Sequence, residues 1–384
     1  MSEKQSPDVT DAPDVTGEGD DASIPRKPDR PWWKQALSIG ITLIVLIAVF
    51  GFVLPKVADY RSIAQYIGEI SPMAWALLAL AAGAFLIAYP IVLVQVLRSL
   101  RLREAFVNHM TGTAITNSVP SGGALALPVN YAIYMSWGFT PESVTAGLLA
   151  AGVWDWFGRI ALPILAVVGV ALLGDAVWWM WLVSLVGVLL VATMMIVLVK
   201  VLGSEEGAQK FADWLDGVGT WVFDRIHRTK PDIVAAVLQF RADLNSIVQT
   251  RAARLTAATV FNHAAMTMLF VVSVYAVGVT TEQVPIPWMV LAFSLGRFLV
   301  MIPVSPGGLG LVDLGWLGLL TMGWQATNPG VPVDHDLIAA GVLLFRGLSL
   351  LPPIPIGMAS WLFWRVNKSW RKDWHVAMRG TTHS

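Results

Sequence analysis

Five residues of fixed charge lie inside long apolar stretches of this 384-residue chain: Asp155, Arg159, Arg297, Asp313 and Arg346. A charged side chain at the centre of a membrane helix costs about 2.5–3.5 kcal/mol on insertion scales, so each needs a partner or a cavity. Three arginines against two aspartates leave an excess of one positive charge. Because the planar guanidinium binds phosphate oxygens in pairs, a cavity on which all five converge would suit a lipid phosphate.

The spacing of the charges also allows a purely structural interpretation. Asp155 and Arg159 are four residues apart with the acid first, which is the better order for an ion pair on one helix face. Pro163 has no N–H for the carbonyl of Arg159, so a free backbone acceptor is expected beside the pair. Closed structural pairs, Asp155–Arg159 and Asp313–Arg346, are the alternative to a binding site, and the sequence leaves both open.

Two glycine turns occupy corresponding positions in the two halves of the chain. Val119-Pro120-Ser121-Gly122-Gly123 is echoed by Val304-Ser305-Pro306-Gly307-Gly308-Leu309-Gly310, and Ala-Ala-Gly-Val follows at 150–153 and at 339–342. This ordered series indicates an internal duplication. Paired, interrupted helices in two halves point to a translocation site near the bilayer midplane, although glycine and proline in membrane helices can also serve close packing alone.

Hydroxyls and free amides at the two turns could add anion-binding donors to the arginines, because helix starts favour anions. The predicted substrate-binding residues are Asp155, Arg159, Arg297, Asp313, Arg346, Ser121, Gly122, Gly123, Ser305, Pro306, Gly307, Gly308 and Gly310.

Two other polar groups favour structural roles. His263, beside Asn262 in an apolar segment, is predicted to form an interhelical hydrogen bond rather than to carry protons. Asp334, His335 and Asp336 have a spacing like that of metal ligands, but they precede a helix, where acids cap free N–H groups. We therefore expect no metal site, no cofactor and no catalytic residue.

The composition is that of a membrane protein. Hydrophobic residues make up 55% of the chain and charged residues 14%, compared with about 25% charged in soluble proteins. The absence of cysteine excludes disulfides, thiol nucleophiles and thiolate metal sites. A net charge of zero leaves no basic surface for a nucleic acid.

The fold class that follows is an all-α polytopic membrane protein with about 7–8 membrane segments. Two of these are helical hairpins broken by proline and glycine, either re-entrant or crossing, and they belong to the internal repeat. Residues 105–135 are expected to form two short arms joined at a turn. The other expected segments lie at about 36–54, 72–97, 142–173, 177–199, 255–279, 286–303 and 336–364, with a glycine-rich stretch at 304–323.

The same patterns divide the chain into regions. Residues 1–31 form an acidic tail predicted to be disordered, 32–365 the transmembrane domain, and 366–384 a basic tail. The repeat halves, about 72–173 and 286–364, are joined by amphipathic helices over 203–253 that are expected on the cytoplasmic membrane surface. Basic residues near the segment ends place both termini in the cytoplasm.

The second half resembles a known family. Ile302-Pro303-Val304-Ser305-Pro306-Gly307-Gly308-Leu309-Gly310, the acid Asp313 and the later Arg346 resemble the C-terminal signature of the flippase-like lysylphosphatidylglycerol synthase transmembrane-region family. Leu97-Arg98, the turn at 117–123 and Trp137-Gly138 are similar to its N-terminal half, so the resemblance covers roughly residues 35–365.

The resemblance implies a membrane region that moves an aminoacylated phospholipid between leaflets. In the best-known members a soluble C-terminal domain makes that lipid. Only about 20 residues follow the last apolar segment here, so lipid synthesis from transfer RNA is not expected. Asp313 stands where glutamate is usual, and Asp155-Trp156-Phe157-Gly158-Arg159 replaces a more common adjacent Glu-Arg, which leaves the identity of the lipid open.

We therefore expect a non-enzymatic protein of the bacterial plasma membrane that passes an anionic or modified phospholipid, or a polyprenyl-phosphate-type lipid, between leaflets. The second glycine turn lacks the Gly-Lys-Ser/Thr of a phosphate loop, so movement would be passive or ion-coupled. One alternative is an intramembrane lipid transferase with Asp155 or Asp313 as base. Another is an accessory scaffold for envelope lipid metabolism. The expected partners are membrane lipids and no nucleic acid, with a homo-oligomer or an envelope-synthesis enzyme left open.

Overall fold

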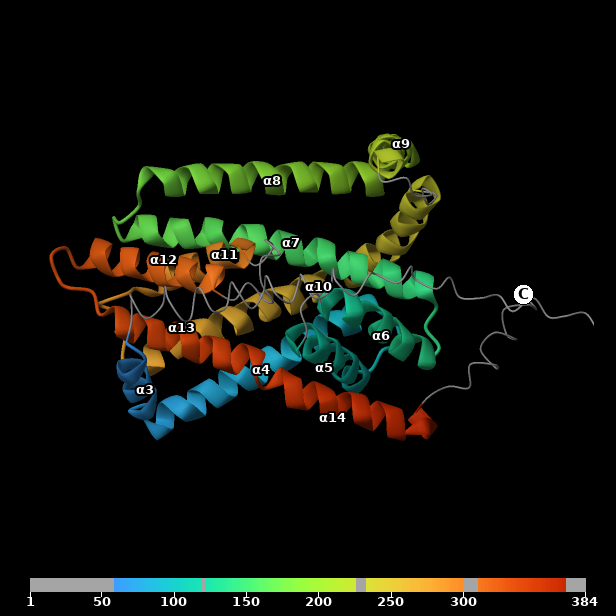
Figure 1. Cartoon of the computed structure of the whole chain (residues 1–384). Helices are drawn as coiled ribbons and strands as arrows, with labels where there is room; N and C mark the ends of the chain where they lie inside the picture. Colours follow the sequence, from blue (N-terminus) through green and yellow to red (C-terminus); the bar gives the residue numbers. More distant parts are fainter. Residues whose placement is uncertain (1–58, 119–121, 226–232, 300–309, 371–384) are drawn as a thin grey trace, which may run out of the picture.

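The computed structural model describes residues 59–118, 122–225, 233–299 and 310–370, and within these ranges the chain is helical with no strand (Figure 1). Five segments are long and apolar enough to cross a membrane. They are α4 (Pro72–Val96), α7 (Pro141–Leu172), α8 (Trp178–Gly203), the later part of α10 (Ile233–Ala276), and α13 (His335–Leu350) with α14 (Pro353–Val366). The predicted N-terminal tail, the first span at 36–54 and most of the basic tail lie outside the described residues.

Both predicted broken segments contain two short helices. In the first half, α5 (Leu102–Ser118) and α6 (Gly122–Ser136) pack against each other, which confirms the two arms expected over 105–135. In the second half, α11 (Ile286–Leu299) and α12 (Leu311–Thr327) form the matching pair. Each helix is too short to span a bilayer of about 30 Å by itself, because an α-helix rises only about 1.5 Å per residue.

The helices that flank the two hairpins run in opposite directions, which is the pattern expected of an inverted repeat when α10 is counted with the second half, ahead of its predicted start at 286. In Figure 1, α4 and α10 run in opposite directions, as do α7 and the α13–α14 pair. Each hairpin packs against the final helix of the other half, α5 against α14 and α11 against α7, while α4 packs along α10. This exchange of contacts is the arrangement expected of repeats related by an axis in the membrane plane.

The linking region differs from the expected pair of separate surface helices. Helix α9 (Glu205–Arg225) is seen end-on in Figure 1, so it runs across the long helices. The second amphipathic stretch and the next span instead form one helix of 44 residues, α10. Residues 233–276 contain neither glycine nor proline, so nothing local ends the helix at the change from amphipathic to apolar sequence.

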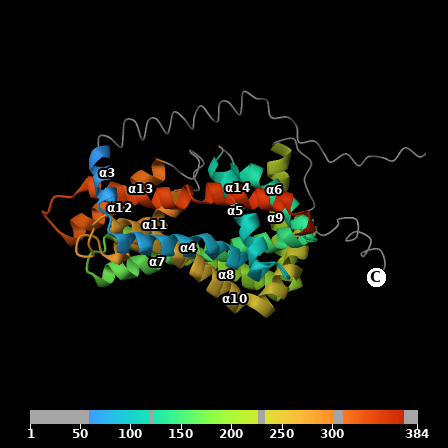
Figure 2. The same ribbon diagram turned by 90° about the horizontal axis from the view of Figure 1, so that it is seen from below.

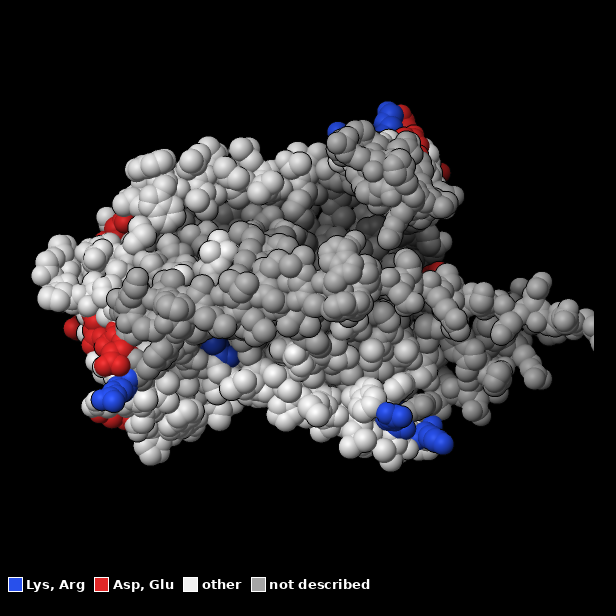
Figure 3. Space-filling view, in the orientation of Figure 1, with Lys and Arg blue, Asp and Glu red and all other residues white. Residues whose placement is uncertain are grey.

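The two ends of the bundle carry different charges (Figures 1–3). The acidic end includes the short helix α3 (Tyr60–Gly68) and the loops after α7, α10 and α12; its acids are Asp59, Glu69, Asp175, Glu282, Asp334 and Asp336. The basic end includes α9 and the loops after α4 and α14. Its bases include Arg98, Arg101, Arg103, Lys200, Arg251, Arg254, Arg365 and Lys368, and its acids include Glu104, Glu142 and four residues of α9.

Hydrogen bonds hold the acidic end together. The Tyr66 hydroxyl donates to Asp334 at 2.7 Å, and the Asp59 amide donates to Asp336 at 2.7 Å. The Asp334 carboxylate raises the pKa of Tyr66 to about 12, because the phenol must keep its proton to donate. Asp334 also caps α13 by accepting from the Leu337 amide at 2.9 Å, which confirms the predicted capping role. No group of acids and histidines among the described residues could hold a metal ion.

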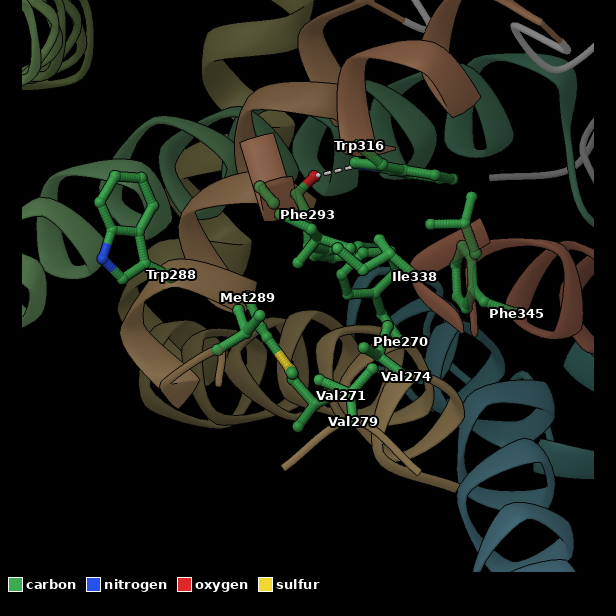
Figure 4. Packing of buried hydrophobic residues seen from close by; sticks show 14 of the residues in the cluster. Phe270, Val271, Val274, Val279, Trp288, Met289, Phe293, Trp316, Ile338 and Phe345 are labelled. Atoms are coloured by element: carbon green, nitrogen blue, oxygen red, sulfur yellow. Dashed lines mark hydrogen bonds between the residues drawn. The ribbon is translucent and has the colours of Figure 1, made fainter. Parts of the chain in front are cut away.

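An aromatic core packs the second half together (Figure 4). Phe270, Phe293, Trp316 and Phe345 come from α10, α11, α12 and α13, and each is at most 2% exposed. Their ring centroids lie 5.2 to 6.2 Å apart, within the range that favours aromatic pairs. In contrast, only 6% of the most apolar stretch of helix α8 is buried, as expected of a helix that faces lipid.

Candidate functional site

Asp155 is the centre of a cluster of charged and polar side chains from three helices, called here the Asp155 cluster. Its carboxylate lies 2.5 Å from Arg159 Nε on the same helix, α7. It also lies 3.4 Å from His263 Nε2 on α10 and 3.8 Å from Arg297 Nη2 on α11. The first half of the chain thus supplies one ion pair, and the second half adds an arginine and a histidine.

The second-half members of the cluster are more deeply buried than the first-half members. The side chains of His263 and Arg297 are 6% and 10% exposed, whereas those of Asp155 and Arg159 are 18% and 27% exposed. Arg297 Nη1 lies 3.4 Å from His263 Nδ1, so His263 makes the interhelical contact that was predicted for it. Two arginines and one aspartate give an excess of one fixed positive charge beside an accessible guanidinium.

Glycine allows the helices of this site to approach one another. A Cβ at Gly158 would collide with the ring of His263, so α7 and α10 can bring Asp155 and His263 together only where the side chain is absent. A Cβ at Gly296 would likewise collide with the indole of Trp316, next to Arg297. Sequence spacing alone does not reveal these contacts, because the partners are on other helices.

The remaining two charges form a separate, buried pair. Asp313 and Arg346 are ion-paired and only 6% and 8% exposed. Asp313 also accepts the Gly310 amide at 2.8 Å at the start of α12, and the Arg346 guanidinium lies 4.5 Å from the Trp316 ring centroid. A buried pair that also caps a helix is consistent with the structural interpretation of these two residues, which stays a prediction.

The five charges therefore do not form one cluster, contrary to the condition for a single binding cavity. Aromatic rings stand between the two groups. Arg297 lies 5.9 Å from the ring centroid of Phe293, which stacks on Trp316 at 6.2 Å, and Trp316 in turn contacts Arg346. The position of Arg346 in the fold separates it from Arg159, although the two arginines correspond in the internal repeat.

The glycine turns are described only in part. Gly122 and Gly123 open α6, and a Cβ at Gly122 would collide with the backbone of α5, so this glycine permits the tight hairpin. Gly310 precedes α12 with φ of 91°, in the region that favours glycine. The other predicted turn residues, Ser121, Ser305, Pro306, Gly307 and Gly308, lie outside the described residues.

A large apolar cavity lies beside the Asp155 cluster, between α7, α8 and α10. Its volume is about 1090 Å³, slightly above the range of about 300–1,000 Å³ that is usual for ligand sites. One wall is a polar stripe on α10 made of Thr256, Thr259, His263 and Thr267. Thr259 is 5% exposed, and its hydroxyl has no hydrogen-bond partner among the described residues. His263 joins this cavity to the charged cluster.

This polar stripe was missed from the sequence. Its signal is the spacing of three or four residues between hydroxyls and the histidine in an apolar helix, which places all four side chains on one face. Threonine in such a helix usually bonds its own backbone, as Thr267 does to the carbonyl of His263 at 2.7 Å. The free hydroxyl of Thr259 is visible only in the folded chain.

Comparison with known proteins gives one distant relative. The chain is 24% identical over 215 residues to a UPF0104 membrane protein of Methanothermobacter thermautotrophicus. The match covers 55% of this chain and 63% of the length of that relative. No protein-family model matches. The five apolar segments and the similarity to this membrane protein together indicate the class of protein. The chain is a multi-pass membrane protein.

Proposed function

We propose that this membrane protein binds the headgroup of an anionic lipid at the Asp155 cluster and passes the lipid between leaflets. One observation carries the proposal: both halves of an inverted repeat contribute charges to a single, partly accessible cluster within the apolar bundle. Charges in such a place are expensive and mark substrate pathways in membrane proteins. A site between inverted repeats is accessible from either side in turn when the halves rock.

The geometry supports a phosphate-bearing headgroup. The side chain of Arg159 is partly exposed and contacts one oxygen of the Asp155 carboxylate, while Arg297 approaches the other oxygen. The excess positive charge is compensated when one phosphate binds. Arginine suits this role because its fixed fork of N–H donors matches phosphate oxygens.

The adjacent cavity favours a lipid, rather than a small anion, as the substrate. Its lining is mainly aliphatic, from Leu162 and Leu165 on α7 to Leu198 on α8. An acyl chain in this space would leave the headgroup near His263, with the free hydroxyl of Thr259 one turn away on the same face. Helix α8 is poorly buried and packs mainly against α7, so it bounds the cavity on the side that faces lipid.

Similarity to known proteins supports the same substrate class. The relative is named only as a UPF0104 membrane protein, but the sequence of this chain itself resembles the lysylphosphatidylglycerol synthase transmembrane region. The best-known members of that family move an aminoacylated phospholipid. We extend to this chain the movement of a lipid, with the headgroup left to experiment, and no lipid synthesis.

The charge asymmetry of the two ends gives the orientation that we propose. Within the described residues Arg61 is the one Lys or Arg of the acidic end, whereas basic side chains gather at the opposite end. Cytoplasmic loops carry the excess of Lys and Arg in membrane proteins, so the basic end faces the cytoplasm. The C-terminal helix α14 ends on that side, and α9 lies there along the membrane surface.

A fluorescence assay in liposomes tests the proposal. The full chain is reconstituted with a trace of headgroup-labelled lipid, and dithionite quenches label in the outer leaflet, so transbilayer movement raises the quenched fraction above one half. Anionic, zwitterionic and aminoacylated headgroups are compared. We expect faster movement of at least one headgroup than in protein-free liposomes, and slower movement with Arg159→Gln.

Arg254→Gln is the matched control, because it removes an exposed arginine of the basic end outside the cluster. Rates equal to those of protein-free liposomes for every headgroup would reject the proposal and favour an accessory protein without transport activity. Equal rates for Arg159→Gln and Arg254→Gln would reject the assignment of the site to the Asp155 cluster.

A further inference from the structure

A second cavity opens at the basic end, away from the Asp155 cluster. Its volume is about 650 Å³, and it lies between the turn after α4, the start of α5 and the start of α7. The polar part of its lining consists of Arg98, Ser99, Arg101, Glu104, Thr140 and Ser143. Asp155 is 14 residues beyond the first residue of α7, about 21 Å along a helix that rises 1.5 Å per residue. The two sites are therefore distinct.

The charges of this cavity, called here the basic-end pocket, are unbalanced. Arg98 and Arg101 are exposed, and neither has an ion-pair partner in the part of the chain that the structure describes. The one acid in the lining is Glu104, which is 9% exposed and accepts the backbone amide of Arg101 at 2.9 Å. Its carboxylate is thus already used to cap α5. One positive charge remains in excess.

A tight turn fixes the two arginines at the pocket. The Leu100 amide donates to the Leu97 carbonyl at 3.3 Å, and Ser99 has φ of 68°, which is uncommon for a residue with a side chain. Leu97 and Leu100 are buried, at 2% and 4% exposed, and they anchor the turn. Arg98 and Arg101 stay outside at its rim. Such strained backbone persists where the surrounding structure holds it, and it is common at binding sites.

The backbone adds further positive potential. The pocket lies at the N-termini of two helices, α5, which begins at Leu102, and α7, which begins at Pro141. The N-terminus of a helix carries a partial positive charge that favours anions. In addition, Trp137 lines the pocket and is 5% exposed, and its indole N–H has no acceptor among the described residues. Every one of these features favours an anion.

We propose that the basic-end pocket binds the phosphate group of an anionic phospholipid from the adjoining leaflet. The apolar lining favours a lipid, because Val96, Leu97, Trp137 and Phe139 form the walls beside the arginines. The pocket also sits where a membrane-spanning helix, α4, ends and another, α7, begins, which is the level of the headgroups. Basic pockets between helices at this level bind anionic lipid headgroups. The site holds a lipid in place and does not depend on transport.

Native mass spectrometry of the full chain in detergent tests the proposal. Phosphatidylglycerol and phosphatidylcholine are titrated separately, and the number and affinity of bound lipids are compared. We expect the double variant Arg98→Gln/Arg101→Gln to weaken phosphatidylglycerol binding about 30-fold at one site, from the usual contribution of two basic residues near a membrane surface. Phosphatidylcholine carries the same phosphate but no net charge, so its binding should weaken less than that of phosphatidylglycerol.

The matched control is the double variant Lys200→Gln/Arg254→Gln, which removes the same charge from exposed positions of the basic end outside the pocket. An equal loss of affinity in both double variants would overturn the proposal, because it would show general attraction between charges. Inorganic phosphate is the competing probe. Displacement of the lipid by millimolar phosphate would assign the pocket to a free anion instead. The Asp155 cluster is intact in both double variants, so failure of the liposome assay leaves this result unaffected.

Discussion

Replacing Gly158 with alanine should displace the His263 ring from the Asp155 cluster. The new Cβ would collide with two atoms of that ring, which is 4% exposed and contacts Asp155 and Arg297. In a helix, Gly→Ala by itself stabilises by about 0.5–1 kcal/mol, whereas overpacking a well-packed site costs about 1–3 kcal/mol. The free energy of unfolding should therefore change by a net loss of about 0–2.5 kcal/mol.

Gly152→Ala on the same helix is the matched control, because nothing lies within 4 Å of a Cβ at that position. It should gain the helix-propensity term of about 0.5–1 kcal/mol without the steric cost. The difference between the two variants is then the overpacking term alone, about 1–3 kcal/mol. Unfolding by a denaturing detergent, followed by circular dichroism in mixed micelles, measures both free energies.

The liposome assay extends the comparison to function. Gly158→Ala should slow lipid movement, because His263 can make room only by giving up its contacts with the carboxylate and the guanidinium, while Gly152→Ala should leave the rate unchanged. Equal stability and equal transport rates for the two variants would refute the reasoning, since they would show that the approach of α7 to α10 at Gly158 imposes no constraint.

Three further predictions concern residues outside the Asp155 cluster. Arg346→Gln leaves Asp313 as a buried charge without its ion-pair partner. The free energy of unfolding in the same micelle assay should therefore fall by about 3–5 kcal/mol. A loss below about 1 kcal/mol would contradict a buried ion pair. Gly357→Ala places a Cβ against the backbone of α5 and should lower the free energy of unfolding by a net of about 0–2.5 kcal/mol, whereas Gly347→Ala meets nothing within 4 Å and should raise it by about 0.5–1 kcal/mol. Equal stabilities would refute the contact between α5 and α14. The pKa of Tyr66 is raised from 10.0 to about 12, so its hydrogen bond to Asp334 stabilises the fold fully below pH 10 and is lost as the pH rises through about 12. The Tm of Tyr66→Phe should therefore fall less than that of the unchanged protein between pH 10 and 12. An equal fall in thermal scans would contradict this role of the hydrogen bond.

The long apolar helices were predictable because their length is set by the bilayer. The expected spans at 72–97 and 177–199 correspond closely to α4 and α8, since an apolar run bounded by charges or loop residues has few alternatives in a membrane. The hairpin of α5 and α6 was predictable from its proline and glycines. The continuous α10 was not, because the change from surface to spanning sequence at about 254 carries no helix-breaking residue.

The candidate site was predictable only where its members are close in sequence. Asp155 and Arg159 are one turn apart, so their pairing follows from helix geometry. Whether Arg297 or Arg346 would join them depends on how α11 and α13 pack, which spacing does not determine. The stacked rings of Phe293 and Trp316 lie between the two arginines, so Arg297 joins the Asp155 cluster and Arg346 does not.

The two charged groups differ in what a movement between the repeats would do to them. Asp313 and Arg346 lie on α12 and α13, in the same half, so rocking of one half against the other would leave their ion pair intact. The Asp155 cluster instead joins α7 of the first half to α10 and α11 of the second. Rigid-body motion between inverted repeats, the usual means of alternating access, would therefore change the distance from Arg297 to Asp155 while Arg159 remained paired. Although the predicted duplication equates Arg159 with Arg346, only Arg159 belongs to the cluster that we propose for lipid binding, where such a motion would change a contact between the halves.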